Sequence, residues 1–164
     1  MAKDTISASD IGKEIAQFVY ENYFINKDSY NTFVSIAGGE IKLSKEQCET
    51  LSIWSLAHSI NPATNLFNDD ISLIIQGEAL RHFSKLANID SKTLLNQYHN
   101  YSKYFYENYS KENSLIDEYW VLDEIGLDSL KQDPYFLTGL KVYIYKTYSG
   151  ILKLHYLDLY KVVV

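Results

Sequence analysis

The chain has 164 residues, 46% of them hydrophobic and 22% charged, which is the usual composition of a single globular domain. Its net charge of −6 and its single arginine, Arg81, argue against nucleic-acid binding, because phosphate backbones are bound by clustered cations. The single cysteine excludes an internal disulfide framework. No signal peptide and no membrane-spanning apolar run is evident, so we expect a cytoplasmic protein without membrane contact.

Apolar side chains recur at steps of three and four residues through most of the chain, which is typical of amphipathic helices. With only 7 Gly and 2 Pro, breaks between elements are few, which favours long helices over a many-stranded sheet. We therefore predict an all-α fold, a compact bundle of about six to seven helices with a long C-terminal helix. Residues 1–164 form one domain in this prediction, and residues 1–7 form a flexible tail.

Start and stop signals place the expected helices along the chain. They cover about residues 9–24, 30–37, 44–58, 71–87, 91–109, 114–126 and 134–160. The third helix begins at a capping box formed by Ser44 and Gln47 and ends before Asn61-Pro62. His58 would then lie near its C-terminus, where the helix dipole favours a cation. Gly126 is expected to stop the sixth helix.

Two of these helices have β-hairpin alternatives. The segment around Gly38-Gly39 fits a hairpin as well as the end of the second helix. In the last segment, Asp133 can cap a helix whose first residue is Pro134. A hairpin across Ser149-Gly150, followed by three β-branched valines at 162–164, would instead make the fold α+β.

The helical periodicity also predicts which side chains form the core. Large apolar residues on the inner faces are expected to be buried: Trp54, Phe83, Phe136, Leu140 and Ile144. Leu73 of the fourth helix is expected on an inner face as well.

Residues that carry chemistry form only weak patterns in this sequence. The chain has no phosphate-binding loop, no GxGxxG fingerprint, no HExxH and no GxSxG. Glu78 and His82 are four residues apart on one helix face, and His155 and Asp158 are three apart, so both pairs are candidate pocket residues. Arg81, one residue before His82, is expected to point away from the face shared by Glu78 and His82 and to make a specific contact with a carboxylate, inside the protein or on a partner.

An acidic segment precedes a basic C-terminal segment. Residues 111–133 hold 7 acidic and 2 basic side chains, whereas residues 134–164 hold 1 acidic and 4 basic ones. The two segments either lie side by side or leave the acidic one, with Asp117 and Glu124 on one helical face, to meet a basic partner. Their spacing is not that of a calcium loop, so we expect a solvated acidic face, no metal and no cofactor.

Tyrosine is unusually frequent, with 15 in the chain, and it concentrates in one predicted helix. Tyr98 and Tyr101 can face the core, but Tyr104 and Tyr106 must point elsewhere, since successive helical positions are 100° apart. Aromatic surface that is left over in this way suggests a partner or self-association. The interaction residues predicted from the sequence are Tyr101, Tyr104, Tyr106, Arg81, Asp117 and Glu124.

These observations favour a small interaction protein that acts by binding another protein, as a regulator, antagonist or immunity-type factor. The partner is expected to be a protein, and a basic one if the acidic face meets it, or a second copy in a homodimer. The alternative is an enzyme or ligand-binding protein with a helix-bundle pocket lined by histidines and carboxylates. The sequence names no substrate, pathway or partner.

Overall fold

The computed structural model describes residues 3–25, 43–108, 122–135 and 160–164, the side chains of Pro62, residues 104–108 and residues 130–131 excepted. Helices dominate this part of the chain, as predicted. In chain order its elements are β1 (Asp4–Ser7), α1 (Ala8–Val19), the π-helix η1 (Tyr20–Ile25), α3 (Lys45–Thr64), α4 (Asp69–Ala87), α5 (Ser91–Asn108), the 3₁₀-helix η2 (Asp128–Gln132) and β2 (Tyr160–Val163).

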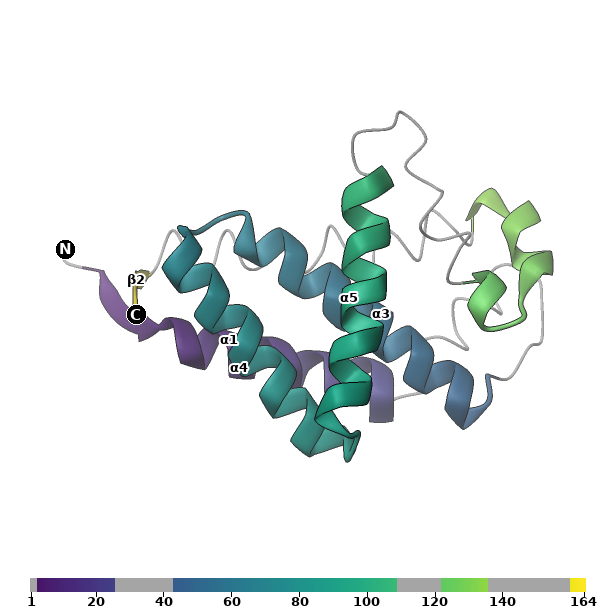
Figure 1. Cartoon of the computed structure of the whole chain (residues 1–164), viewed down its shortest axis with the longest axis horizontal. Helices are drawn as coiled ribbons and strands as arrows, with labels where there is room; N and C mark the ends of the chain where they lie inside the picture. Colours follow the sequence, from purple (N-terminus) through teal and green to yellow (C-terminus); the bar gives the residue numbers. More distant parts are fainter. Residues whose placement is uncertain (1–2, 26–42, 109–121, 136–159) are drawn as a thin grey trace.

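Helix α3 lies at the centre of the described structure. All side chains from residue 51 to residue 61 are buried, so no face of this stretch reaches solvent. Helix α4 returns along α3 as a helical hairpin, α5 crosses α3, and α1 lies against α4 (Figure 1). Trp54 of α3 and Phe83 of α4 are in this core, as predicted, whereas Leu73 is exposed and the prediction for it is wrong.

Local capping signals account for where most of these helices begin. Ser44 and Gln47 form the predicted capping box, and the Asn68 side chain accepts a hydrogen bond from the Ile71 N–H at the start of α4. Asp90 caps α5 in the same way. The first helix begins at Ala8, one residue earlier than expected, because the cap is Ser7, whose hydroxyl accepts from the Asp10 N–H.

The expected end of the third helix at His58 is wrong. Helix α3 continues through Asn61-Pro62 to Thr64, and His58 is buried inside it rather than placed at its C-terminus. A proline within a helix removes one backbone hydrogen bond. Burial of neighbouring side chains such as Ile60 and Ala63 offsets that loss, since both are fully enclosed.

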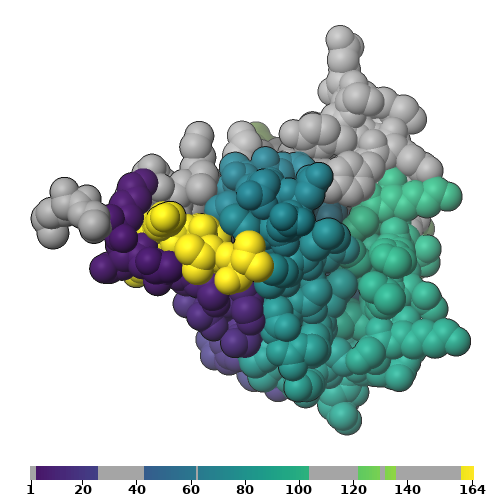
Figure 2. Space-filling model, turned by 60° about the vertical axis from the view of Figure 1, so that its left-hand side comes forward, coloured from purple at the N-terminus to yellow at the C-terminus, as the bar shows by residue number. Residues whose placement is uncertain are grey.

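The two ends of the chain pair with each other. Residues 1–7 are expected to form a flexible tail, but Asp4–Ser7 form β1, which pairs in parallel with β2. Figure 2 shows the C-terminal segment, in yellow, beside the N-terminal one, in purple. Ile6 pairs with Val162 in this register, and both side chains pack against the core. A pairing partner more than 150 residues away leaves no local signal, which is why periodicity could not predict it.

Several expected elements lie outside the described residues and stay predictions. They are the helix at 30–37 with its hairpin alternative, most of the helix at 114–126, and the long helix after Pro134 with its own hairpin alternative. Two residues at the described edges of these segments, Gly126 and Asp133, have the stop and cap geometry that the sequence predicts. Gly126 has a φ of 71° after a helical turn, and the Asp133 carboxylate accepts from the Tyr135 N–H. Tyr160, the expected end of the last helix, already belongs to β2.

Contact between α1 and α4 depends on a glycine. Ala8, Gly12 and Ala16 are spaced by four along the buried side of α1, which lets the two backbones approach closely. A Cβ atom on Gly12 would lie 2.6 Å from the carbonyl oxygen of Ile75 and 3.0 Å from the backbone nitrogen of Ala79. Both of these are backbone atoms, so they cannot move aside without displacing α4.

Replacing this glycine should therefore destabilise the protein. We expect Gly12→Ala to lower the free energy of unfolding by about 1–3 kcal/mol, despite the better helix propensity of alanine. Gly77→Ala in α4 is the matched control, because a Cβ there meets nothing within 4 Å. It should raise stability by about 0.5–1 kcal/mol. Urea unfolding measures both, and an equal effect of the two changes would contradict the close contact.

Candidate functional site

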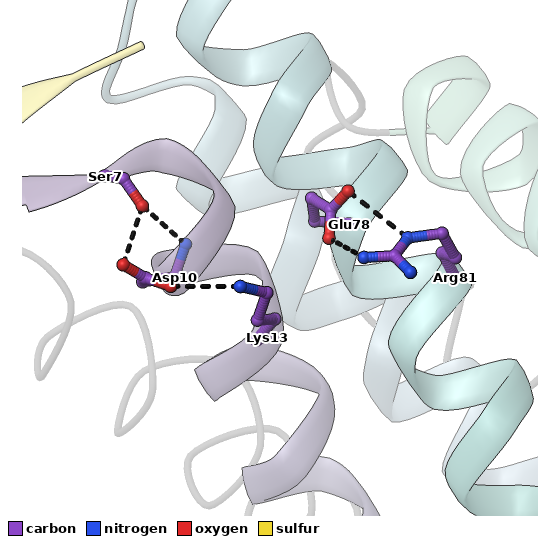
Figure 3. Close-up of polar contacts among 5 residues, drawn as sticks. All are labelled: Ser7, Asp10, Lys13, Glu78 and Arg81. Carbon is purple, nitrogen blue, oxygen red and sulfur yellow. Dashed lines mark hydrogen bonds and ion pairs between the residues drawn. The ribbon is translucent and has the colours of Figure 1, made fainter.

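Charged side chains of alternating sign line the crossing of α1 and α4 (Figure 3). In the first turns of α1, Asp10 accepts from the Ser7 hydroxyl at 2.7 Å and from the Lys13 ammonium at 3.1 Å. In α4, the guanidinium of Arg81 donates through Nε and Nη2 to the two carboxylate oxygens of Glu78. The result is a polar surface whose acid and base groups are paired along each helix.

The carboxylate of Glu78 is stabilised in its charged form. Hydrogen bonding to Arg81 is the main reason why the pKa of Glu78 lies below its usual value, and Lys13 and Ser9 of α1 add to this effect. Arg81 was expected to point away from Glu78, but it contacts that carboxylate, because residues three apart on a helix are also neighbours. His82 is half-buried on the next part of the helix, and the Glu78 carboxylate is paired with Arg81 rather than with His82.

A cluster of hydrogen-bonded polar side chains, Asn61, Tyr98 and Ser102, is buried between α3 and α5. The Tyr98 hydroxyl donates to the Asn61 side-chain oxygen at 3.1 Å, and the Ser102 hydroxyl lies 3.4 Å from both polar atoms of the same amide. These side chains are buried, so their hydrogen bonds replace those that water would make. The group fixes how α5 lies across α3.

Further polar atoms are buried in α3 and α5 besides the cluster of Asn61, Tyr98 and Ser102. The centroids of the His58 and Trp54 rings are 4.3 Å apart. The Nδ1 of His58 lies 2.9 Å from the Trp54 carbonyl oxygen, to which it donates. Among the described residues, no acceptor reaches the buried Nε1 of Trp54 and no donor reaches the buried Oε1 of Gln97. The sequence does not indicate that these polar groups are buried. Ser102 and Gln97 are polar residues in a helix, which usually face solvent, and Asn61 was expected to lie beyond the end of its helix.

Tyr101 and Glu124 come together from different elements. Tyr101 is 4% exposed, so its ring contributes to the core, whereas Glu124 is exposed at the end of the helical turn 122–124, just before the turn at 125–126. Burial, and secondly the nearby charge of Glu124, raises the pKa of Tyr101 to about 12. The same turn is held to α3 by Gln47, whose side-chain amide donates to the Ile125 carbonyl at 2.8 Å. An acidic turn therefore adjoins the middle of α5.

The remaining predicted site residues are outside what the structure describes. The backbones of Tyr104 and Tyr106 lie in α5, but their side chains are not described, and Asp117, His155 and Asp158 fall in segments that are not described at all. Within the described ranges, no three His, Cys, Asp or Glu side chains gather closely enough to hold a metal ion. None of the described helices has a stretch long and apolar enough to cross a bilayer.

Comparison with known proteins adds no assignment: no family model, no curated protein and no solved structure matches the chain.

The buried group between α3 and α5 can be tested by removing one hydroxyl. Tyr98→Phe leaves the ring in place and deprives the buried Asn61 oxygen of its best donor. We expect the free energy of unfolding to fall by about 1–2 kcal/mol. Tyr135→Phe is the control, because Tyr135 is 83% exposed and should tolerate the change within about 0.5 kcal/mol. Equal stability of the two variants would contradict a structural role for the Tyr98 hydroxyl.

The Glu78–Arg81 pair should appear in the acid titration of the protein. Since the folded pKa of Glu78 is lowered, its contribution to stability is present above the unfolded value of about 4.3 and is lost as the pH falls through the folded pKa. Carboxyl titration by NMR should show this pKa rising toward its usual value in Arg81→Gln. The control, Lys85→Gln, removes a charge from the same helix and should leave the Glu78 pKa nearly unchanged. An unchanged pKa in Arg81→Gln would show that the pair does not persist in solution.

Proposed function

We propose that this protein acts in the cytoplasm by binding another protein, and that the outer side of α5 with the adjoining acidic turn is the binding surface. The observation that supports this most directly is the exposure pattern of α5. Leu94, Tyr98 and Tyr101 are buried on one side of the helix, whereas Leu95 is 40% exposed and His99 is also exposed. An exposed leucine beside an exposed histidine is a surface that a partner could cover.

Position 106 belongs to the same side of α5. It follows Leu95 by eleven residues and His99 by seven, and both intervals are close to whole numbers of helical turns. A tyrosine at this position would extend the Leu95–His99 surface by an amphipathic ring. Tyrosine is enriched among residues that dominate binding, because it buries a large area at a small entropic cost. Position 104 lies on the opposite flank of the buried side, so Tyr104 would border the surface from there.

The charge next to α5 indicates what kind of partner fits. Asp123 and Glu124 are exposed in the helical turn 122–124, which adjoins Tyr101, and Asp128 is exposed shortly after it. Acidic side chains at the rim of an aromatic surface raise the association rate with a basic partner and disfavour acidic ones. We therefore propose a basic surface on the partner, with Arg81 and Asp117 as more distant candidates for contact.

The proposal is tested by partner capture from the native host with a tagged full-length chain, followed by mass spectrometry and binding measurements with the purified partner. Tyr104→Ser/Tyr106→Ser should weaken that binding about tenfold or more, because it removes an aromatic ring from the proposed surface at position 106 and a second one from its border at position 104. Glu124→Lys should slow association and reduce its dependence on salt.

Tyr135→Ser serves as the control, because it removes an exposed tyrosine outside α5. The melting temperatures of all variants should stay close to that of the parent. Unfolding of the double variant would place Tyr104 and Tyr106 in the core. Unchanged binding of a folded double variant would show that the partner uses a different surface.

A further inference from the structure

Helix α4 carries a row of five exposed residues on the side opposite α1. Asp69, Leu73, Gly77, Arg81 and Lys85 follow one another at intervals of four, so they form a single ridge along the helix, about 24 Å long. The buried residues Ile75 and Ala79, which lie against Gly12 of α1, are on the other side of α4. The surface of α4 faces the viewer in the middle of Figure 2.

Two residues in this row are unusual for a solvent-facing position. Leu73 is 67% exposed, and Gly77 occupies the middle of a helix although nothing lies within 4 Å of the place where its Cβ would be. A glycine at an exposed interior position costs about 0.5–1 kcal/mol relative to alanine. At Gly12 the packing of α1 on α4 explains the glycine, but no described contact explains Gly77. The position is, however, suited to a close approach by a second backbone.

The charges of the row are complementary to themselves. Asp69 stands at one end, Arg81 and Lys85 stand toward the other, and Gly77 is at the midpoint. If two such rows align in opposite directions about Gly77, Asp69 of one copy meets Lys85 of the other, and Leu73 meets the aliphatic part of Arg81. Each contact then occurs twice, as a two-fold axis requires. Arg81 keeps its pairing with Glu78, which uses only Nε and Nη2.

We infer that α4 is a homodimer interface, in which two copies of this chain cross antiparallel at Gly77 with their i, i+4 ridges aligned. Ridges of this type interlock at a crossing angle of about 50°, and a small residue at the crossing point permits close backbone contact. The interface rests on one helix per copy, so it is small and the dimer dissociates readily. The inference is argued from α4 alone and does not rest on the proposed partner surface on α5. The two surfaces share one residue, Arg81, which was named above as a more distant candidate for contact with that partner.

The test uses the purified full-length chain alone, so its outcome does not depend on whether a partner exists. Sedimentation velocity from about 10 μM to about 1 mM should show a monomer–dimer equilibrium in the range expected for a small interface. Gly77→Ala should weaken the dimer about fivefold or more, because each added methyl group separates the helices. The same change should stabilise the monomer, so a loss of association cannot be attributed to unfolding.

Charge exchange tests the direction of the two helices. Lys85→Glu should weaken the dimer about two- to tenfold, since it places two acidic groups together at both ends of the interface. The double variant Asp69→Lys/Lys85→Glu should restore association, because the charges are exchanged and remain complementary. Lys45→Glu, an exposed position in the first turn of α3, is the matched control for the change in net charge and should have little effect.

A cross-link tests the position of the two-fold axis. In a Cys48→Ala background, Gly77→Cys should form an intermolecular disulfide under mild oxidation, since the two positions face each other at the distance that such a bond requires, a Cα separation of about 4.4–6.8 Å. Lys92→Cys on α5 should cross-link much less. A monomer throughout the concentration range overturns the inference. So does a dimer that is insensitive to Gly77→Ala and to Lys85→Glu and is not linked through position 77.

Discussion

The structure depends on the complete burial of the middle of α3. From residue 51 to residue 61 the helix is enclosed on all sides, so its polar side chains depend on partners inside the protein, which the described residues supply for all but the Nε1 of Trp54. The hydroxyls of Ser52, Ser55 and Ser59 donate to carbonyl oxygens four residues earlier in the same helix, at 2.6–2.8 Å. Serine thus serves as a small, internally satisfied residue at these positions. That small size is what allows α1, α4 and α5 to pack around α3 at once.

Around this centre, aromatic and polar contacts set the positions of the outer elements. Tyr20 and Phe24 of η1 pack edge-on against Phe83 of α4, with ring centroids 6.5 and 6.1 Å apart. Where α1 passes into η1, the Asn22 side chain donates to the Phe18 carbonyl oxygen at 2.8 Å. On the opposite side of α3, Asn61 ties α5 in place through Tyr98. The surfaces proposed for binding lie on the faces of α4 and α5 that these contacts leave exposed.

Glycine has two different roles on the two sides of α4. Gly12 permits α1 to touch the backbone of α4, which is a requirement of the fold. Gly77 faces solvent in the described structure, so its cost in helix propensity has no counterpart within the chain. The charged side chains beside these glycines differ in the same way. Lys13 and Ser9 of α1 help to lower the pKa of Glu78 across the α1–α4 contact, whereas Lys85 and Asp69 are exposed on the outer face.

By itself, the sequence determined the helical class of the protein and most of its described helix starts, together with the stop at Gly126. These features depend on residues within about four positions of one another, such as Ser44 with Gln47, so they can be recognised without knowing the fold. Only the tertiary structure decided that α3 continues past Pro62, that the chain termini pair as strands, and that Asn61 is buried while Leu73 is exposed. Each of these depends on what another part of the chain covers or contacts. Burial can outweigh a local stop signal such as proline, and strand pairing joins residues that share no local pattern.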